Sequence, residues 1–323
     1  MQVMSVTGPV AAEDLGPTLV HEHIIIALPG EELDPRYAPN RELIVQIAVE
    51  RLKELHGHGI RTLVDPCPIE LGRDPQLYAE VSEKSGVQII FATGFYFEAL
   101  GIPGYWRARD TEEIAEFYIH ELTHGVGKTG LRPGVIKAAT GFEVSDNERR
   151  ILAAAAQAQK AMGCAIITHT EHSRHGDVQQ QIFAENGADP GRILIGHQDE
   201  QTAWEPIRDL AARGTFVGID RVGTEALAPD SRRADHAAAL VKHGYAGHLC
   251  LSQDRVCTLS AARFPFRIPH AAKLDPVQYM QNGRPLSYVF TEFAAMLRER
   301  GVSDVDLDTI FRANPRRLLT GMP

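Results

Sequence analysis

The chain has 323 residues, of which 44% are hydrophobic, and a formal net charge of -9. This length allows a core of useful size, and the mild acidity argues against a nucleic-acid or an anionic-membrane partner. No apolar run reaches the ~18 residues of a membrane span, and the N-terminus lacks a basic region followed by an apolar one, so a cytoplasmic protein is expected.

Strand-like and helix-like segments alternate along the chain from residue 18 onward. Strands are expected at 18–24, 61–68, 87–96, 134–141, 164–170, 192–199, 215–221 and 248–254. Helices are expected at 40–59, 74–86, 111–126, 145–163, 175–187, 203–214, 231–244, 285–301 and 306–319. The helix at 145–163 has the clearest start, because Ser145 and Glu148 form a capping box.

Eight strands, each followed by a helix, predict an α/β fold of the (β/α)8, or TIM barrel, type. The strands are apolar nearly throughout, as expected when both faces of a parallel sheet are covered. The alternative, an open doubly wound sheet, normally carries a Gly-rich phosphate loop after its first strand, and "HEHIIIALPG" is not such a loop.

Residues 1–323 are expected to form a single barrel domain, because no linker, low-complexity segment or repeat divides the chain. A short β-hairpin in residues 1–16 is expected to close the barrel bottom. The irregular stretch 255–284 follows the eighth strand, so it should lie over the C-terminal mouth of the barrel.

The four cysteines are scattered, with no CxxC pair; they are Cys67, Cys164, Cys250 and Cys257. This spacing suggests neither a disulfide framework nor a thiolate zinc site, and all four thiols are expected to be reduced.

Ionisable side chains stand where the predicted strands end, at the face where such barrels hold their active sites. These residues are His21, His23, Lys137, His169, His197 and Asp254. His21 and His23 share a strand face because side chains alternate with a period of two. Burying each group without a partner would be costly, whereas metal ions would supply a partner to all of them.

Each of these residues alone has a plainer interpretation. A single histidine at a strand end is more often a satisfied core residue than a ligand, and Asp254 could be a cap. Lys137 could be an ion-pair partner or a Schiff-base nucleophile. Six such residues at the ends of five strands are much harder to explain in this way, which favours a metal centre.

The segments "GPTLVHEH", "GVIKAAT", "ITHT", "ILIGH", "LSQD" and "NPRRLL" together resemble the phosphotriesterase family of the amidohydrolase superfamily. The family includes phosphotriesterase-like lactonases and phosphotriesterase-related proteins. "LGRD", "ATGFY" and "GIDR" are also similar to the family. The resemblance implies that His21, His23 and Asp254 bind one metal ion and that His169 and His197 bind a second. It also implies that Lys137 is carboxylated and that its carbamate bridges the two ions.

Histidine and carboxylate ligands without thiolates suit Zn2+, and also Mn2+, Co2+ or Fe2+; two zinc ions are expected. Two ions ~3.5–4 Å apart would lower the pKa of a bridging water, and the resulting hydroxide would attack a substrate whose C=O or P=O one metal polarises. Asp254 would accept the proton of the nucleophile and pass it outward.

Tyr96 and Arg221 are the next candidate catalytic residues, because both resemble residues of the lactonase branch. Arg221 would orient a substrate oxygen or close the pocket; its alternative is a surface salt bridge. Gln253 stands where lactonases often have a histidine, and the loops after the first and eighth strands differ from theirs. The reaction class therefore carries over better than the substrate.

The expected function is a binuclear metal-dependent hydrolase whose partner is a small ester, lactone or organophosphate. The resemblance also implies a homodimer. The alternatives are an amide or phosphoester hydrolase on the same centre, a Lys137 Schiff-base lyase, and a barrel that keeps its metal without turnover.

Overall fold

The computed structural model describes residues 1–35, 39–260 and 283–322. Most of the stretch expected over the mouth of the barrel, 255–284, therefore lies outside the described residues. Among the residues that are described, no helix is both long and apolar enough to cross a bilayer.

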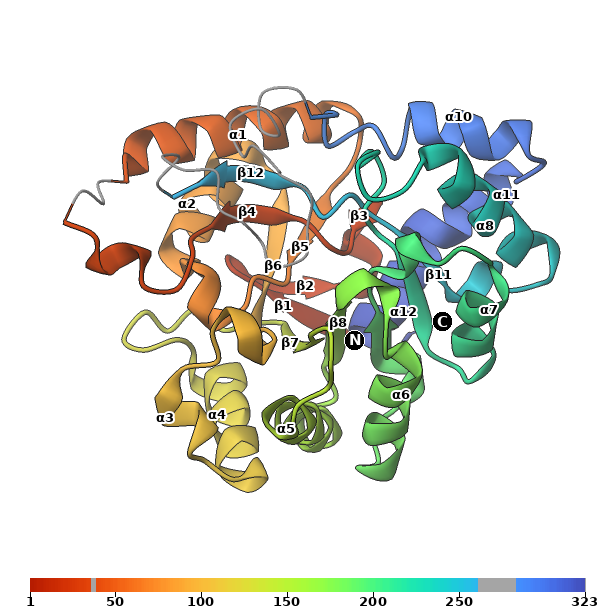
Figure 1. Cartoon of the computed structure of the whole chain (residues 1–323). Helices are drawn as coiled ribbons and strands as arrows, with labels where there is room; N and C mark the ends of the chain where they lie inside the picture. The colour runs from red at the N-terminus through yellow and green to blue at the C-terminus, as the bar shows by residue number, and fades with distance from the viewer. Residues whose placement is uncertain (36–38, 261–282, 323) are drawn as a thin grey trace.

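Eight parallel strands form one sheet that curves into a nearly closed barrel (Figure 1). In chain order they are β3 (Thr18–Leu19), β5 (Thr62–Asp65), β6 (Gln88–Gly94), β7 (Val135–Thr140), β8 (Ala165–Thr170), β9 (Ile193–Ile195), β10 (Phe216–Ile219) and β11 (Leu249–Leu251). Each strand pairs with the next along the chain. The first and eighth strands continue into β4 (His23–Ile26) and β12 (Val256–Leu259), which pair with each other and bring the two edges together.

Helices surround the strands on the outside, so the prediction of a TIM barrel is confirmed (Figure 1). The longer ones are α1 (Arg41–Gly57), α2 (Pro75–Ser85), α4 (Thr111–His124), α5 (Asp146–Met162), α6 (Gly176–Glu185), α7 (Glu205–Ala212), α8 (Asp230–Lys242) and α10 (Glu292–Glu299). The shorter ones are α3 (Gly104–Arg107), α11 (Asp304–Asp308) and α12 (Asn314–Thr320). The capping box of Ser145 and Glu148 starts α5 as predicted.

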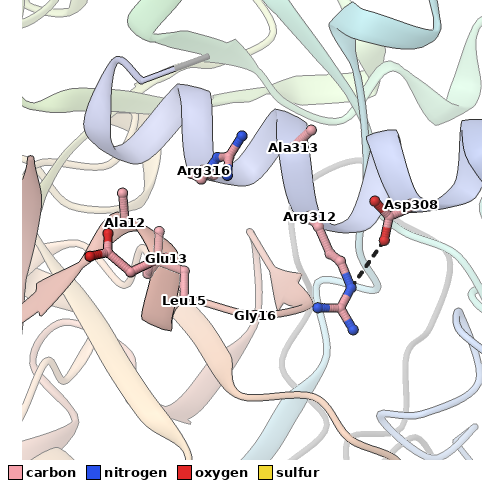
Figure 2. Close-up of a pocket in the computed structure, with 8 residues that line it drawn as sticks. All are labelled: Ala12, Glu13, Leu15, Gly16, Asp308, Arg312, Ala313 and Arg316. Carbon is pink, nitrogen blue, oxygen red and sulfur yellow. Dashed lines mark ion pairs between the residues drawn. The ribbon is translucent and has the colours of Figure 1, made fainter.

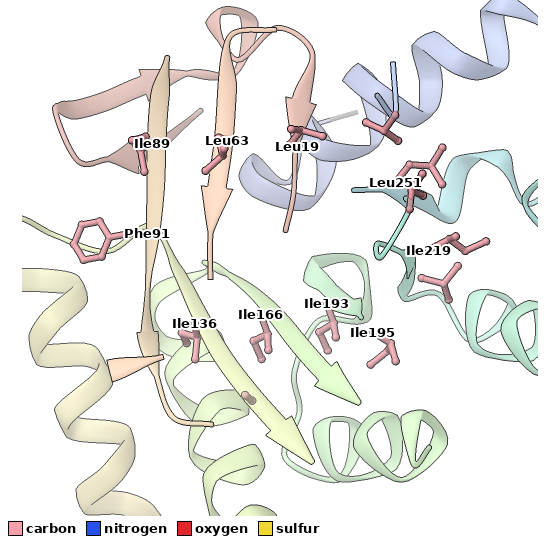
Figure 3. Packing of buried hydrophobic residues seen from close by; sticks show 14 of the residues in the cluster. Leu19, Leu63, Ile89, Phe91, Ile136, Ile166, Ile193, Ile195, Ile219 and Leu251 are labelled. Atoms are coloured by element: carbon pink, nitrogen blue, oxygen red, sulfur yellow. The ribbon is translucent and has the colours of Figure 1, made fainter. Parts of the chain in front are cut away.

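The strands bury apolar side chains on both faces, as their sequences indicate. On β6, for example, Ile89 and Phe91 belong to the cluster between strands and helices, whereas Ile90 and Ala92 belong to the barrel interior. Figure 3 shows part of the outer cluster, including Ile89 and Phe91. This period of two also decides which strand-end side chains enter the barrel.

An N-terminal hairpin of β1 (Gln2–Ser5) and β2 (Gly8–Ala11) pairs antiparallel, as predicted. Val3 and Val10 join the interior cluster together with Leu318 and Leu319 of α12, so the hairpin and the last helix close one end of the barrel. Between them lies a hollow of about 170 Å³, lined by Glu13 and Arg312 among others (Figure 2). This hollow is at the end of the barrel opposite the strand-end residues.

Three predicted elements are interrupted in the structure, one helix and two strands. The last helix, predicted at 306–319, contains a π-helical turn over Thr309–Ala313. The strands predicted at 18–24 and 248–254 break at 20–22 and at 252–255, because the backbone turns at Asp254, whose φ is +50°. There the Ser252 hydroxyl and the Glu22 carboxylate accept backbone N–H groups that a regular strand pair would have satisfied.

All four cysteines are free thiols in the structure. Cys67, Cys250 and Cys257 are buried, and Cys164 is half-buried.

Candidate metal centre at the carboxyl ends of the strands

The six predicted ligands meet at the carboxyl ends of the strands. His21 lies between β3 and β4, His23 begins β4, and Lys137 is in β7. His169 is in β8. His197 lies two residues after the end of β9, and Asp254 lies three residues after the end of β11. Five of the six are at most 5% exposed, and the Asp254 side chain is 20% exposed, so the cluster opens to solvent at Asp254.

Asp254 is the centre of this cluster. Its Oδ1 lies 3.1 Å from Nε2 of His23 and 3.9 Å from Nε2 of His21. Its Oδ2 lies 3.6 Å from Nε2 of His197. Lys137 joins from the barrel interior, with Nζ 3.0 Å from Nε2 of His21. Three histidines thus present the same ring nitrogen to one carboxylate.

The second ring nitrogen of each histidine contacts another buried carboxylate. Asp220 contacts two of them, with Oδ2 2.9 Å from Nδ1 of His21 and Oδ1 2.8 Å from Nδ1 of His197. Asp65 lies 3.2 Å from Nδ1 of His23. Such contacts fix the tautomer and the orientation of a metal-binding imidazole and make it a better ligand.

His169 has the opposite orientation. Its Nε2 lies 2.8 Å from the Glu171 carboxylate, so Nδ1 is the nitrogen that remains for the site. The hydroxyl of Tyr96 lies 3.3 Å from that Nδ1, and the His169 and His197 rings meet edge to face with centroids 4.5 Å apart. Four histidines therefore each have one nitrogen held by a carboxylate and one directed into the cluster.

Burial favours neutral side chains here, which is the form that binds metal. It lowers the pKa of His169 to about 4 and lowers the pKa of His21 and His197 below the ordinary value. His23 differs: burial alone would lower its pKa, but the hydrogen bonds to Asp254 and Asp65 outweigh that effect and raise it. Burial also lowers the pKa of the Lys137 amine to about 8, since no carboxylate accepts a hydrogen bond from it among the contacts described.

These donors fit divalent metal ions. The ligand atoms of His21, His23 and Asp254 lie within 4.8 Å of one another, as a shared ion requires. His197 and Asp254 also hold left-handed backbone conformations, with φ of +57° and +50°. Such conformations are strained for residues other than glycine and are concentrated at functional sites.

The two predicted catalytic residues, Arg221 and Tyr96, both lie against the cluster. Arg221 donates from Nε to Oδ2 of Asp254 at 3.0 Å and from Nη1 to Glu200 at 3.3 Å. Its side chain is 13% exposed, so the alternative of a surface salt bridge does not describe it. Tyr96 reaches the cluster through His169, as described above.

Three carboxylates of the site were not among the predicted residues: Asp65, Asp220 and Glu171. Asp65 and Asp220 each follow the apolar run of a predicted strand, which is the signal that identified the six predicted ligands. Glu171 lies two residues after His169 in a loop, and nothing in its spacing indicates the contact.

The sequence matches the family profile described as "Phosphotriesterase family" over residues 1–319. An aryldialkylphosphatase of Saccharolobus solfataricus is 29% identical over 313 residues, which cover 96% of this chain and 97% of the relative. A mutant of a Deinococcus radiodurans PTE-like lactonase has a similar structure, with a TM-score of 0.89, 34% identity, and coverage of 98% of this chain and 99% of the other.

The similar proteins also include an N-acetyltaurine hydrolase. The N-acetyltaurine hydrolase of Rattus norvegicus is 26% identical over 359 residues, which cover 99% of this chain and 98% of the relative. The similarity again extends over the whole barrel rather than over one segment.

Proposed function

This chain belongs to the phosphotriesterase family and is a metal-dependent hydrolase of ester bonds, and we propose that it acts on lactones or other carboxylic esters at a centre of two divalent metal ions. We propose that phosphotriester hydrolysis also takes place on this centre, either as a main activity or as a side activity. The lactonase and the aryldialkylphosphatase among the similar proteins support these two substrate classes.

One observation carries the proposal: four histidines each place one ring nitrogen on a carboxylate, while the other nitrogen faces Asp254 in three of them and the Tyr96 hydroxyl in His169. We propose that His21, His23 and Asp254 hold one ion and that His169 and His197 hold the other. Lys137 would be carboxylated and shared between the two. The neutral amine that carboxylation requires is favoured by the burial of Lys137. Zinc is the proposed metal, because the donors are nitrogen and oxygen without thiolate.

When bound, the two ions would polarise the C=O or P=O of the substrate and lower the pKa of a water molecule. The protein side chains have separate tasks. Asp254 accepts the proton that the attacking water loses, and it is the member of the cluster that reaches solvent. Arg221 holds the Asp254 carboxylate in place. The hydroxyl of Tyr96 can donate to a substrate oxygen near His169.

The test is metal content measured together with hydrolysis. Protein produced with ample zinc or manganese is analysed for metal per chain and assayed on a panel of lactones, on an aryl ester and on paraoxon, with and without chelator. We expect two ions per chain and chelator-sensitive turnover. A chain without stoichiometric metal, or turnover that survives an Asp254→Asn change, contradicts the proposal.

Amide hydrolysis is a second candidate, supported by the similarity to N-acetyltaurine hydrolase over the full chain. An N-acetyl amide belongs in the same assay, and turnover of the amide above all esters would favour it. Borohydride trapping distinguishes a hydrolase from a Lys137 Schiff-base lyase. In the presence of substrate, borohydride would label Lys137 only if the protein were such a lyase.

We further propose that the chain folds as a single domain, forms a homodimer and acts in the cytoplasm. Light scattering during size-exclusion chromatography tests the dimer directly.

A further inference from the structure

Glu22 lies between the ligands His21 and His23 in the sequence and is fully buried. Its carboxylate spans the gap between the first and the eighth strand. Oε1 accepts the backbone N–H of Gln253 at 2.7 Å, and Oε2 accepts the backbone N–H of Arg255 at 2.7 Å. The two amides that it holds are those on either side of Asp254.

The backbone of Asp254 is held from the same side. Its N–H donates to the carbonyl of His21 at 3.0 Å, so three successive amides, 253 to 255, all bond to residues 21 and 22. Asp254 has a φ of +50°, in the left-handed region that is uncommon for residues other than glycine and is kept when the surroundings stabilise it. The Glu22 carboxylate supplies that constraint.

We propose that Glu22 is a positioning residue, which holds the amides flanking Asp254 and thereby fixes the Asp254 carboxylate among His21, His23 and His197. The inference rests on the proposed function, because the position of Asp254 matters for activity only if Asp254 serves the metal centre. Glu22 touches neither substrate nor metal in this account and acts only through Asp254.

The chemistry of the contact requires a full-length carboxylate. Only a carboxylate presents an acceptor oxygen to both N–H groups, whereas a glutamine would turn its NH2 toward one of them. An aspartate would withdraw both oxygens by about one C–C bond, ~1.5 Å, which is too short to reach the two amides. Burial raises the pKa of Glu22, and the two backbone N–H groups oppose this rise because they favour the carboxylate.

A general loss of stability must be distinguished from loss of positioning, and Asn314 offers a matched control. Asn314 is buried, and its Nδ2 donates to two backbone carbonyls, those of Ala246 and Leu249, at 2.7 Å each. It therefore supports the same strand, β11, at the end remote from Asp254. An Asn314→Ala change removes two side-chain-to-backbone hydrogen bonds without touching residues 253 to 255.

The first measurement is amide hydrogen exchange of the metal-free proteins. In Glu22→Gln we expect the amides of Gln253 and Arg255 to exchange at least about tenfold faster than in wild type, the change that corresponds to ~1.4 kcal/mol for a lost hydrogen bond. In Asn314→Ala these two amides should exchange as in wild type. Unchanged exchange in Glu22→Gln would show that the carboxylate does not hold the turn.

The second measurement is zinc affinity by chelator competition, followed by steady-state kinetics at saturating zinc. Glu22→Gln should bind zinc at least about tenfold more weakly and lower kcat with little change in KM. Asn314→Ala should lower Tm and keep the zinc affinity. Equal zinc affinity in wild type and Glu22→Gln overturns the inference and leaves the proposed function intact, whereas a wild type that binds no zinc overturns both.

If Glu22→Gln does not fold, Glu22→Asp keeps the carboxyl group and allows the same comparison. Faster exchange at Gln253 and Arg255 together with weaker zinc binding than in wild type supports the inference. Wild-type values in both measurements contradict it, because the shorter side chain cannot span the two amides.

Discussion

The Nε atom of Arg221 lies 3.0 Å from Oδ2 of Asp254, and this ion pair is at the point where the buried cluster meets solvent. The same guanidinium reaches Glu200 with Nη1. A planar guanidinium can make both contacts at once, whereas the single ammonium of a lysine cannot hold this geometry.

Replacing Arg221 by lysine is therefore expected to lower kcat/KM for the best ester substrate at least about tenfold, or ~1.4 kcal/mol of transition-state stabilisation, even though the charge is kept. Arg221→Met should lower it further. Steady-state kinetics at matched metal content measures the effect. Arg298→Lys is the control, because Arg298 forms an exposed pair with Asp304 and should leave activity unchanged. Full activity in Arg221→Lys would show that charge alone suffices at this position.

Asp220→Asn is expected to weaken metal binding about 10- to 100-fold while the barrel stays folded. The carboxylate of Asp220 contacts Nδ1 of both His21 and His197 and also accepts the backbone N–H of His197. An asparagine has only one acceptor oxygen and would present an NH2 group to one of these partners. Chelator competition measures the affinity, and circular dichroism checks the fold. Asp209→Asn, on the exposed surface of α7, should bind metal like wild type.

Lys137→Met should stabilise the metal-free protein but abolish its metal-dependent activity. Burial lowers the pKa of Lys137 to about 8 from its ordinary 10.5, so below about pH 8 the folded state encloses an unfavourable positive charge. This destabilisation amounts to at most ~3 kcal/mol and disappears as the pH rises from about 8 to 10.5.

Urea denaturation in CO2-free buffer tests the Lys137 prediction. The free energy of unfolding of Lys137→Met should exceed that of wild type at pH 7, and the difference should shrink toward pH 10. A methionine variant that is less stable than wild type at pH 7 would mean that the amine has a compensating partner in the folded chain.

We expect Glu70 to give the stability of the protein a pH dependence opposite in sign to that caused by Lys137. Burial raises the pKa of Glu70 to about 7, although its Oε1 accepts the backbone N–H of Tyr96 at 2.7 Å. Oε2 is enclosed and has no hydrogen-bond partner among the described residues. The folded chain therefore keeps a proton that the unfolded chain loses near pH 4.5, and the stability of the wild type falls as the pH rises from about 4.5 to 7.

Glu70→Gln removes this titration. We expect the variant and the wild type to have the same free energy of unfolding near pH 4.5. Above pH 7 the variant should be more stable by at most ~3 kcal/mol, and the difference should be smaller than this limit because part of the Glu70 side chain reaches solvent. Unfolding in urea at a series of pH values measures the difference. A difference that stays constant across the series would contradict the raised pKa of Glu70.

The period of two along each strand made the clustering of the six strand-end residues predictable. On β7, Ile136 faces the helices and Lys137 faces the barrel interior. On β8, Ile166 faces the helices, so by the same alternation His169, three residues later, faces the barrel interior. Because parallel strands in a barrel end at one face, residues at strand ends in distant parts of the sequence had to meet there. The fold and the identity of the cluster therefore followed from the sequence.

The contacts around the cluster could not be predicted in this way. That one carboxylate, Asp220, supports both His21 and His197 depends on the distance between strands and on side-chain rotamers, which a linear pattern does not contain. Glu171 reaches His169 from an irregular loop, for which no periodicity exists. Such contacts depend on how the loops fold against the strand ends.

The sequence by itself determined the barrel and the set of strand-end side chains that form the cluster, because both follow from local periodicity and from the common end of parallel strands. Only the tertiary structure decided how those side chains are oriented. The seam between the first and eighth strands shows why: Glu22 and Asp254 are 232 positions apart, and the hydrogen bonds that hold the turn at Asp254 form only when the barrel closes.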